Sequence, residues 1–440
     1  MYEGKPRTLF AKYAIPQMIG LLFNSVYVIV DGIFIGNRLG RDAMAAAAVS
    51  VPFVEILIAL SMAVASGAGV MISGQLGRGE REKALQTFHA AMLCAAAFGG
   101  LIIVLGNMFI HPLAELLGSM PQIHEEAVRY LWYIVTFSPF LLFSFLLGGL
   151  ARNDGRSKLA MVALAVGSVS NIILDYVFMY PLNMGIAGAA LATAVGPVFS
   201  VLILLPHFLL KKGKLHFAKT HIRFDPIKHI LILGFPALIL GFPAFIMEFT
   251  IGIVTFVYNF AIVKHGYGEI GLAAYLIIGY LMLIILTLFL GMAEGLQPVF
   301  SYFVGVGEEN RSREMRRFAV KVFLGIGILC YLLIILFSRG FYSIFSPHDP
   351  ELIAFAAGKS IPYFCGFFLA GYNILMISYW QSMQKTKSAL TVSLSRSIVW
   401  PAILTSLLPL AFGNEVIWLC HSLSEGITAC TAFILLKRRG

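Results

Sequence analysis

Three polar side chains lie seven residues apart in the first long apolar stretch, residues 10–36: Gln17, Asn24 and Asp31. Seven residues of α-helix make nearly two turns, so these groups form one stripe along a helix, with Tyr27 on the same side. The stretch is long enough to cross a bilayer. A carboxylate inside a membrane helix costs roughly 2.5–3.5 kcal/mol on insertion scales. We therefore expect Asp31 to face protein or water rather than lipid.

A second polar pair, Asn171 and Asp175, lies four residues apart and therefore on one helix face. Thr193 follows in the next apolar stretch, among small residues that allow helices to pack closely. We expect these three residues and Asp31 to form a buried polar pocket. Two neighbouring carboxylates in a low dielectric cannot both ionise cheaply, so the pair should hold a proton or a Na⁺ ion. That is the chemistry of a cation-coupled carrier; the alternative is a set of polar groups that only fixes helix packing.

A third stripe contains Glu248, Thr255 and Asn259, again at helical spacing. Its acid could face a central cavity and bind substrate cations, or neighbouring hydroxyls could neutralise it. Glu55 and Glu294 also lie in apolar surroundings, and the sequence assigns them no role. The candidate substrate-cavity residues are Gln17, Asn24, Tyr27, Glu248, Thr255 and Asn259.

Pro16 lies about one turn inside the first stretch. Proline removes a backbone hydrogen bond and crowds the preceding turn, so a bend is expected there. The bend could be a hinge that responds to protonation of Asp31, or it could be a static kink. The sequence is compatible with both.

Three further ionisable positions in apolar stretches have simpler interpretations. Lys359 and Arg396 lie near enough to the ends of their stretches for their charges to reach the membrane interface. Glu425 and His421, four residues apart, favour a paired interior contact.

The elements that must position these residues are membrane helices. Of the 440 residues, 59% are hydrophobic and only 12% are charged, whereas soluble domains have about 25% charged residues. The net charge of +10 resides in short loops, which indicates membrane topology and no nucleic-acid partner. We therefore predict an all-α polytopic membrane protein. Its twelve expected spans are residues 10–36, 46–73, 85–110, 128–150, 159–181, 185–210, 229–262, 270–300, 317–337, 355–383, 388–411 and 414–436.

Lys and Arg are concentrated in the N-terminal tail, in the loops after even-numbered spans and in the C-terminal tail. By the positive-inside rule both termini are expected in the cytoplasm. The long basic segment 211–228 separates two halves of six spans, residues 1–210 and 229–440. Internal similarity supports a repeat with parallel topology. At a constant offset, Gly67, Ser73, Gly77, Gly79 and Glu80 align with Gly295, Ser301, Gly305, Gly307 and Glu308.

Several kinds of chemistry have no motif in this sequence. The histidines lack the spacing of a metal site, and no phosphate-binding loop is present. The five cysteines lie singly in apolar stretches. We expect no cofactor, no catalytic residue and no enzymatic activity, and no metal except a possible Na⁺ ion at Asp31 and Asp175.

The stretches AIPQMIGLLFNSVYVIVDGIFIGNRLG, AAAAVSVPF, ISGQLGRGEREKA and LAAYLIIGYLMLIILTLFLGMAEGLQPVFSYFVGVGEENR resemble the multidrug and toxic compound extrusion (MATE) transporters. The resemblance implies two six-helix lobes around a cavity, and antiport of cationic, drug-like compounds against H⁺ or Na⁺. It places Asp31 at the family's first-helix acid, Pro16 at its bend, and Glu248 at a seventh-helix acid. The remaining coupling-cluster positions, Asn171, Asp175 and Thr193, resemble those of the prokaryotic DNA-damage-inducible branch.

The tenth span, 355–383, contains no Asp or Glu, which departs from other branches and favours coupling in the N-terminal lobe. The predicted protein is therefore an antiporter of the cell's inner membrane, working as a monomer within the lipid bilayer on small drug-like molecules. One alternative is a flippase for lipids or lipid-linked precursors of the same superfamily. Such proteins usually carry several basic residues in the cavity, whereas these spans hold mainly acids. The other alternative, a membrane enzyme, lacks a visible cluster of catalytic residues.

Overall fold

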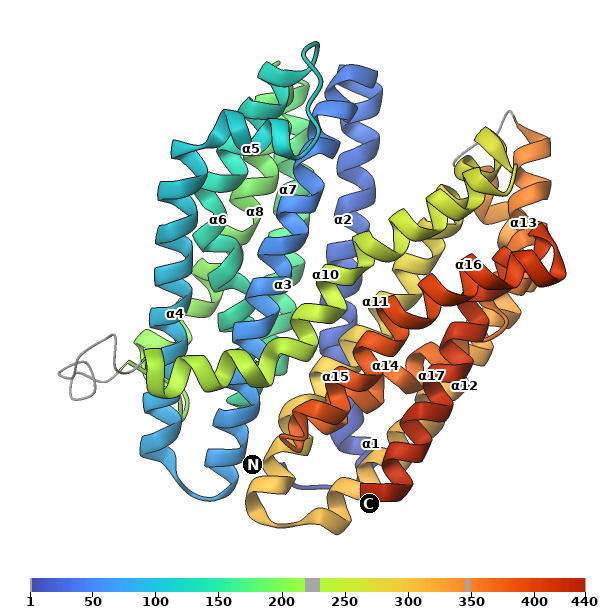
Figure 1. Cartoon of the computed structure of the whole chain (residues 1–440). Coiled ribbons are helices and arrows are strands. Elements are labelled where there is room, and N and C mark those ends of the chain that lie inside the picture. The colour runs from blue at the N-terminus through green and yellow to red at the C-terminus, as the bar shows by residue number, and fades with distance from the viewer. Residues whose placement is uncertain (1, 218–229, 345–348, 440) are drawn as a thin grey trace.

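The computed structural model describes residues 2–217, 230–344 and 349–439, and all regular secondary structure in these residues is helical (Figure 1). The basic segment 211–228 lies mostly outside the described residues. The first half contains α1 (Pro6–Leu9), the π-helix η1 (Phe10–Ala14), α2 (Ile15–Leu39), α3 (Arg41–Gly77), α4 (Arg81–Met108), α5 (Ile110–Leu116), α6 (His124–Asn153), α7 (Ser157–Met179) and α8 (Ile186–Leu209).

The second half begins with a π-helix, as the first half does after its opening turn. It contains η3 (Ile230–Gly234), α10 (Phe235–Lys264), α11 (Gly268–Val306), α12 (Glu309–Ser343), α13 (Pro350–Phe364), α14 (Phe367–Ser382), α15 (Thr386–Leu394), η4 (Ser395–Val399), α16 (Trp400–Phe412), η5 (Asn414–Val416) and α17 (Ile417–Arg439).

Within the described residues, eleven helices are long and apolar enough to cross a membrane, and a bent pair makes a twelfth span. This confirms the twelve predicted spans. The bent pair is α13 and α14, which meet at 49°. Ser422 of α17 holds the break: its Oγ accepts a hydrogen bond from the Gly366 backbone N–H at 2.8 Å and donates to the Tyr363 carbonyl at 2.7 Å. The freed backbone groups are thus satisfied inside the protein, as a broken membrane helix requires.

Within the described residues, each of the three π-helical segments ends two residues before a proline. The segments η1, η3 and η4 precede Pro16, Pro236 and Pro401. A proline ring collides with the carbonyl four residues earlier, and the wider π-turn relieves that collision. The first span thus contains a widened turn just before Pro16, where a bend is expected, and the described part of the second half opens with the same arrangement.

The internal repeat extends to backbone conformation. Gly79 and Gly307 have φ angles of 77° and 83°, in the left-handed region that favours glycine. The next residues, Glu80 and Glu308, precede α4 and α12 with φ/ψ of −82°/59° and −84°/58°. Two turns of closely matching conformation thus follow equivalent helices, α3 and α11.

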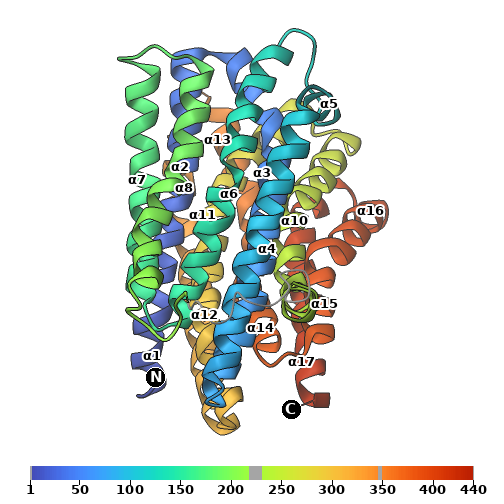
Figure 2. The same ribbon diagram turned by 90° about the vertical axis from the view of Figure 1, so that its left-hand side faces the viewer.

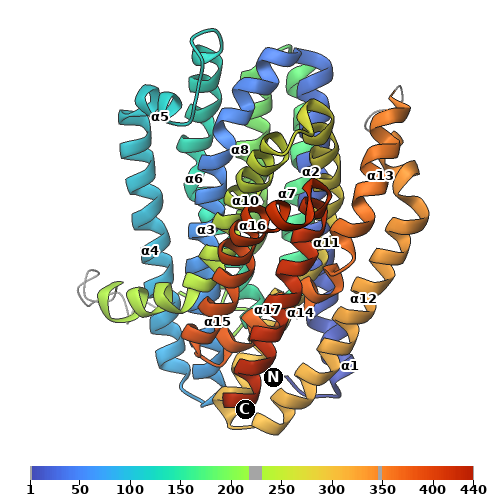
Figure 3. The ribbon, with the colours of Figure 1, turned by 45° about the vertical axis from the view of Figure 1, so that its right-hand side comes forward.

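The helices form two groups that converge at the end carrying both termini and diverge toward the opposite end (Figure 1). Seen from the side, α7, α8, α6 and α4 cover the first group (Figure 2). In the second group, α12 and α13 lie at the edge farthest from α4 (Figure 3). Gly77 and Gly305, which the repeat makes equivalent, contact each other across the converging end. Equivalent residues meet in this way on a two-fold axis.

The first span joins both groups. Tyr2, Leu9, Phe10, Tyr13 and Ala14 are buried in the hydrophobic core of the second half. Further along, α2 packs against α7 of the first half, and its residue Ile35 belongs to a first-half core. The polar stripe of this span therefore begins near the second half and ends inside the first.

Candidate functional site

Asp31 on α2 and Asp175 on α7 lie close enough to interact electrostatically, because α2 packs against α7. Asp175 is fully buried, and Asp31 is half-buried with its Oδ1 buried. A hydrogen bond between two carboxyl groups needs a proton on one of them, since ionised carboxylates only accept. The pair can therefore share one proton or hold one cation between its oxygens.

The surroundings of this pair are polar but supply few donors. Asn171 Nδ2 donates to Thr193 Oγ1 at 3.5 Å, and Tyr130 of α6 also reaches Thr193. Among the described residues, no group outside the pair donates a hydrogen bond to Asp31 Oδ1 or to either Asp175 oxygen, and Asn171 Oδ1 likewise has no donor. These buried acceptors form a site suited to H⁺ or a dehydrated Na⁺, with Thr193 and Tyr130 at its edge.

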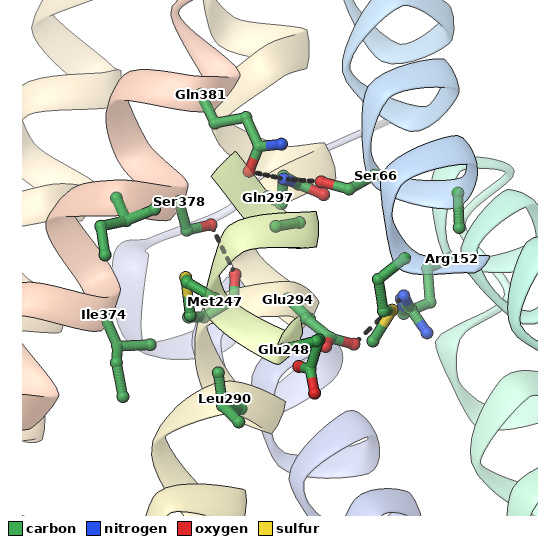
Figure 4. A pocket seen from close by; sticks show the side chains of 15 residues that line it. Ser66, Arg152, Met247, Glu248, Leu290, Glu294, Gln297, Ile374, Ser378 and Gln381 are labelled. Carbon is green, nitrogen blue, oxygen red and sulfur yellow. Dashed lines mark hydrogen bonds and ion pairs between the residues drawn. The ribbon is translucent and has the colours of Figure 1, made fainter. Parts of the chain in front are cut away.

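A second polar site lies between the two halves, in a pocket lined by α3, α6, α10, α11 and α14 (Figure 4). Its charged groups are Glu248, Glu294 and Arg152, and Met247 and Leu290 contribute apolar surface. The two carboxylates are close enough to interact electrostatically. If both are ionised, the single guanidinium leaves one uncompensated negative charge.

Glu294, in the second half, receives polar contacts from two helices of the first half. Gln17 Nε2 of α2 donates to Glu294 Oε2 at 2.8 Å, and Arg152 Nη2 of α6 approaches the same oxygen at 3.4 Å. Amides close the pocket on another side, where Gln297 Nε2 donates to Ser66 Oγ at 2.7 Å and to Gln381 Oε1 at 3.1 Å. The pocket thus combines anionic, amide and thioether groups, a lining that suits an amphipathic cation.

The structure divides the predicted cavity residues among several places. Glu248 lines the pocket between the halves, and Gln17 contacts it through Glu294. Asn24 and Tyr27 line a separate pocket inside the first half, together with Thr193. The remaining two, Thr255 and Asn259, line neither pocket; Thr255 lies beside Tyr275 in the second half. Glu55, which had no predicted role, interacts electrostatically with both Tyr27 and Glu248.

The second half contains a buried cluster of its own. Arg396 Nε lies 2.7 Å from Glu425 Oε1, and Asn373 Nδ2 donates to Glu425 Oε2 at 2.8 Å. His421 stacks on Tyr363 with ring centroids 4.7 Å apart. The expectation that Arg396 reaches the membrane interface is wrong, because its side chain is only 11% exposed and pairs inside the protein. Glu425 pairs mainly with Arg396, while His421 lies 3.9 Å away.

One group on the surface has the composition of a metal site that sequence spacing does not indicate. His111, His124 and Glu125 place their ligand atoms within 4.8 Å of one another. His111 Nδ1 and His124 Nε2 are 3.1 Å apart, and Ser119 Oγ contacts His124 Nδ1 at 2.9 Å. Hydrogen bonds between exposed and half-buried side chains account for these contacts.

Two residues of these sites, Arg152 and Tyr130, are missed by reasoning from the sequence. The fourth span is expected to end at residue 150, which leaves Arg152 among the loop charges, whereas α6 continues to Asn153. Tyr130 has the position of an ordinary aromatic residue at a span end. One signal for Arg152 is its local sequence: the guanidinium lies beside Gly148 and Gly149, small residues that make room for it.

The described architecture defines a class: a polytopic helical membrane protein with two related halves around buried polar sites, as in secondary transporters with parallel repeats. The particular family follows from direct comparison. The MatE family model matches residues 16–177 and 243–407, one segment in each half. The chain therefore belongs to the MatE family and is a MATE family transporter, which confirms the resemblance seen in the sequence.

Similar proteins match nearly the whole chain. The multidrug export protein MepA of Staphylococcus saprophyticus is 24% identical over 428 residues, covering 96% of this chain and 92% of its own length. An FAD transporter of Shewanella oneidensis is 22% identical over 399 residues, covering 88% of this chain and 84% of its own length.

Solved structures show the same fold. An outward-facing multidrug resistance MATE family transporter superposes with a TM-score of 0.92 at 22% identity, over 99% of this chain and 96% of that chain. A MATE crystal structure in the straight conformation gives a TM-score of 0.91 over the same shares, again at 22% identity.

Proposed function

We propose that this protein is a secondary active antiporter that exports amphipathic cationic compounds, drugs or toxic metabolites, in exchange for H⁺ or Na⁺. The observation that carries the proposal is the proximity of Asp31 and Asp175 among buried oxygens that accept no hydrogen bond from other described residues. Holding a cation there and releasing it to the other side of the membrane is the elementary step of coupling.

The proposed mechanism assigns one task to each site. With both termini in the cytoplasm, the halves converge on the cytoplasmic side and diverge outward. A proton or Na⁺ enters the first half from outside and neutralises Asp31 and Asp175. Movement of α2 about its widened turn near Pro16 then displaces substrate outward, and the cation leaves to the cytoplasm. The membrane potential contributes about 2.3 kcal/mol per charge per 100 mV to this exchange.

Substrate binding is assigned to the pocket between the halves. Its surplus of carboxylate over guanidinium attracts a cation, and Met247 and Leu290 contact the apolar part of the molecule. The export activity named for the staphylococcal relatives supports the same assignment.

The test is efflux of a fluorescent cationic dye from vesicles containing the purified protein, under an imposed pH or Na⁺ gradient. We expect Asp31→Asn to reduce gradient-driven efflux at least tenfold, because an amide can neither carry the proton nor neutralise Na⁺. Asp175→Asn should have a similar effect. The gradient that drives efflux in the parent protein identifies the coupling ion.

Asp42→Asn is the matched control, since this carboxylate is exposed at the start of α3. It should retain parental efflux. Undiminished efflux in Asp31→Asn would remove that residue from the coupling site. If neither gradient moves dye in the parent protein, the exporter proposal fails and transfer of labelled lipid between leaflets becomes the assay, as a flippase requires.

A further inference from the structure

We propose that Arg152 is an internal competitor of the cationic substrate. Its guanidinium pairs with the Glu294 carboxylate when the converging end is closed, and leaves that carboxylate free when the end opens. The site is the Glu294 carboxylate, and the ligand is a single cationic group on an amphipathic molecule. This inference rests on the proposed export function and adds to it a reason why affinity for substrate alternates between the two states.

The first observation is where the two partners come from. Arg152 lies at the end of α6 in the first half, and Glu294 lies on α11 in the second half. Their 3.4 Å contact therefore bridges the halves (Figure 4). Any motion that separates the halves at this end must lengthen it, whereas contacts within one half are unaffected.

The second observation is that Arg152 is anchored close to the closed end. Tyr2 Oη donates to the backbone carbonyls of Arg152 and Asn153, at 3.3 Å each. Tyr2 itself is held by the second half, because Arg311 Nη2 donates to its carbonyl at 3.2 Å. The position of Arg152 is thus tied to the closure of this end through the N-terminal segment.

The third observation is that the pair is replaceable. A tight charge-assisted hydrogen bond measures about 2.7–2.9 Å, and the Arg152–Glu294 contact is longer. Arg152 Nε is buried and has no acceptor among the described residues. Glu294 is more accessible, with 19% of its side chain exposed against 9% for Arg152. A ligand cation in the pocket can therefore reach Glu294 once Arg152 moves away.

Charge balance gives the direction of the effect. With Arg152 in place, Glu294 is neutralised and Glu248 alone remains to attract a cation. With Arg152 withdrawn, two carboxylates face the pocket, and affinity for a cation rises. On closing, the guanidinium returns to Glu294 and expels the bound charge. Gln17 donates to the same Glu294 oxygen at 2.8 Å. Gln17 lies on α2, the helix that carries Asp31, so this contact connects the exchange to α2.

The test measures binding and transport separately, with tetraphenylphosphonium as the probe cation. In the purified full-length protein, Arg152→Gln should bind tetraphenylphosphonium about tenfold more tightly than the parent, while dye efflux falls at least fivefold because release is slowed. A purely structural role would weaken both. Arg152→Lys keeps the competing charge and should bind as weakly as the parent.

Glu294→Gln keeps the test decisive if Arg152→Gln does not fold. It leaves Arg152 facing the pocket without its partner, so tetraphenylphosphonium should bind at least tenfold more weakly than in the parent. The double variant Arg152→Gln/Glu294→Gln should lose the gain of the single variant. Arg313→Gln, which removes an arginine from the exposed pair with Glu309, is the matched control and should bind as the parent does.

Two results would overturn the inference: a folded Arg152→Gln protein with parental or weaker affinity, or a Glu294→Gln protein with parental affinity. Failure of the export proposal looks different. In that case the parent moves no cationic dye under any gradient, yet Arg152→Gln still binds tetraphenylphosphonium more tightly.

Discussion

Gly241→Ala is expected to destabilise the protein by about 1–3 kcal/mol and to reduce dye efflux at least tenfold. Helices α3 and α10 cross in backbone contact through two matching pairs of small residues. A Cβ added at Gly241 would overlap the carbonyl oxygen of Ala63, and one added at Gly67 would overlap that of Ala237. In each helix the two small residues are four apart, the spacing that lets membrane helices approach most closely.

The physical reason for a large effect is that the obstructing atoms are backbone. A flexible side chain could rotate away from the new methyl group, but a helix carbonyl moves only with its helix. Separation of α3 from α10 would open the crossing that joins the two halves. Thermal unfolding followed by tryptophan fluorescence, together with efflux, measures both consequences, and Gly67→Ala should reproduce them.

Gly279→Ala is the control for helix propensity. A Cβ at this position of α11 meets no atom within 4 Å. The substitution should be neutral or stabilising, by up to about 1 kcal/mol, because alanine loses less backbone entropy in a helix. If Gly241→Ala has the same unfolding midpoint and the same efflux rate as Gly279→Ala, the close crossing of α3 and α10 is not present in the state that limits transport.

The spans and the repeat can be predicted from the sequence because both depend on local properties. Hydrophobic length determines a membrane helix, and helical spacing by itself places Asn171 and Asp175 on one face. The pairing of Asp31 with Asp175 can be inferred only from the cost of burial. A buried carboxylate needs a partner, and Asp175 is the other candidate acid in the polar cluster of the first half.

Contacts between the halves cannot be predicted in the same way. Arg152 and Glu294 are 142 residues apart, and neither belongs to a polar stripe that would mark its neighbour. The division of Gln17 and Asp31 between two sites has a similar cause. Helical spacing places them in one stripe, but α2 packs against both α11 and α7, so the two ends of the stripe face different neighbours.

The break of the tenth span and the burial of Arg396 are failures of local rules. The stretch 355–383 is apolar over most of its length, and the bend between α13 and α14 depends on Ser422 of another helix. Arg396 is close to a span end, where long basic side chains usually extend to the interface. Its partner Glu425, from the last helix, holds it inside instead.

The buried pair gives the second large expected effect. Arg396→Met should destabilise the protein by about 3–5 kcal/mol, because it leaves the Glu425 carboxylate, 1% exposed, without a counter-charge. Asn373 would still donate to this carboxylate, at 2.8 Å. The double variant Arg396→Met/Glu425→Gln should recover most of the loss, since an amide can still accept from Asn373. The unfolding midpoint of each variant and of the double variant gives the coupling between the two residues.

Lys359→Met is the matched control for removing a cation. Its partner Glu415 has a side chain that is 73% exposed, so water can solvate the carboxylate after the substitution. The unfolding midpoint should therefore barely change. If Arg396→Met also leaves the midpoint unchanged, Glu425 is not held as an ion in the interior. A double variant less stable than Arg396→Met alone would show that the carboxylate contributes through contacts other than the arginine. Recovery in the double variant would assign the pair to the packing of the second half.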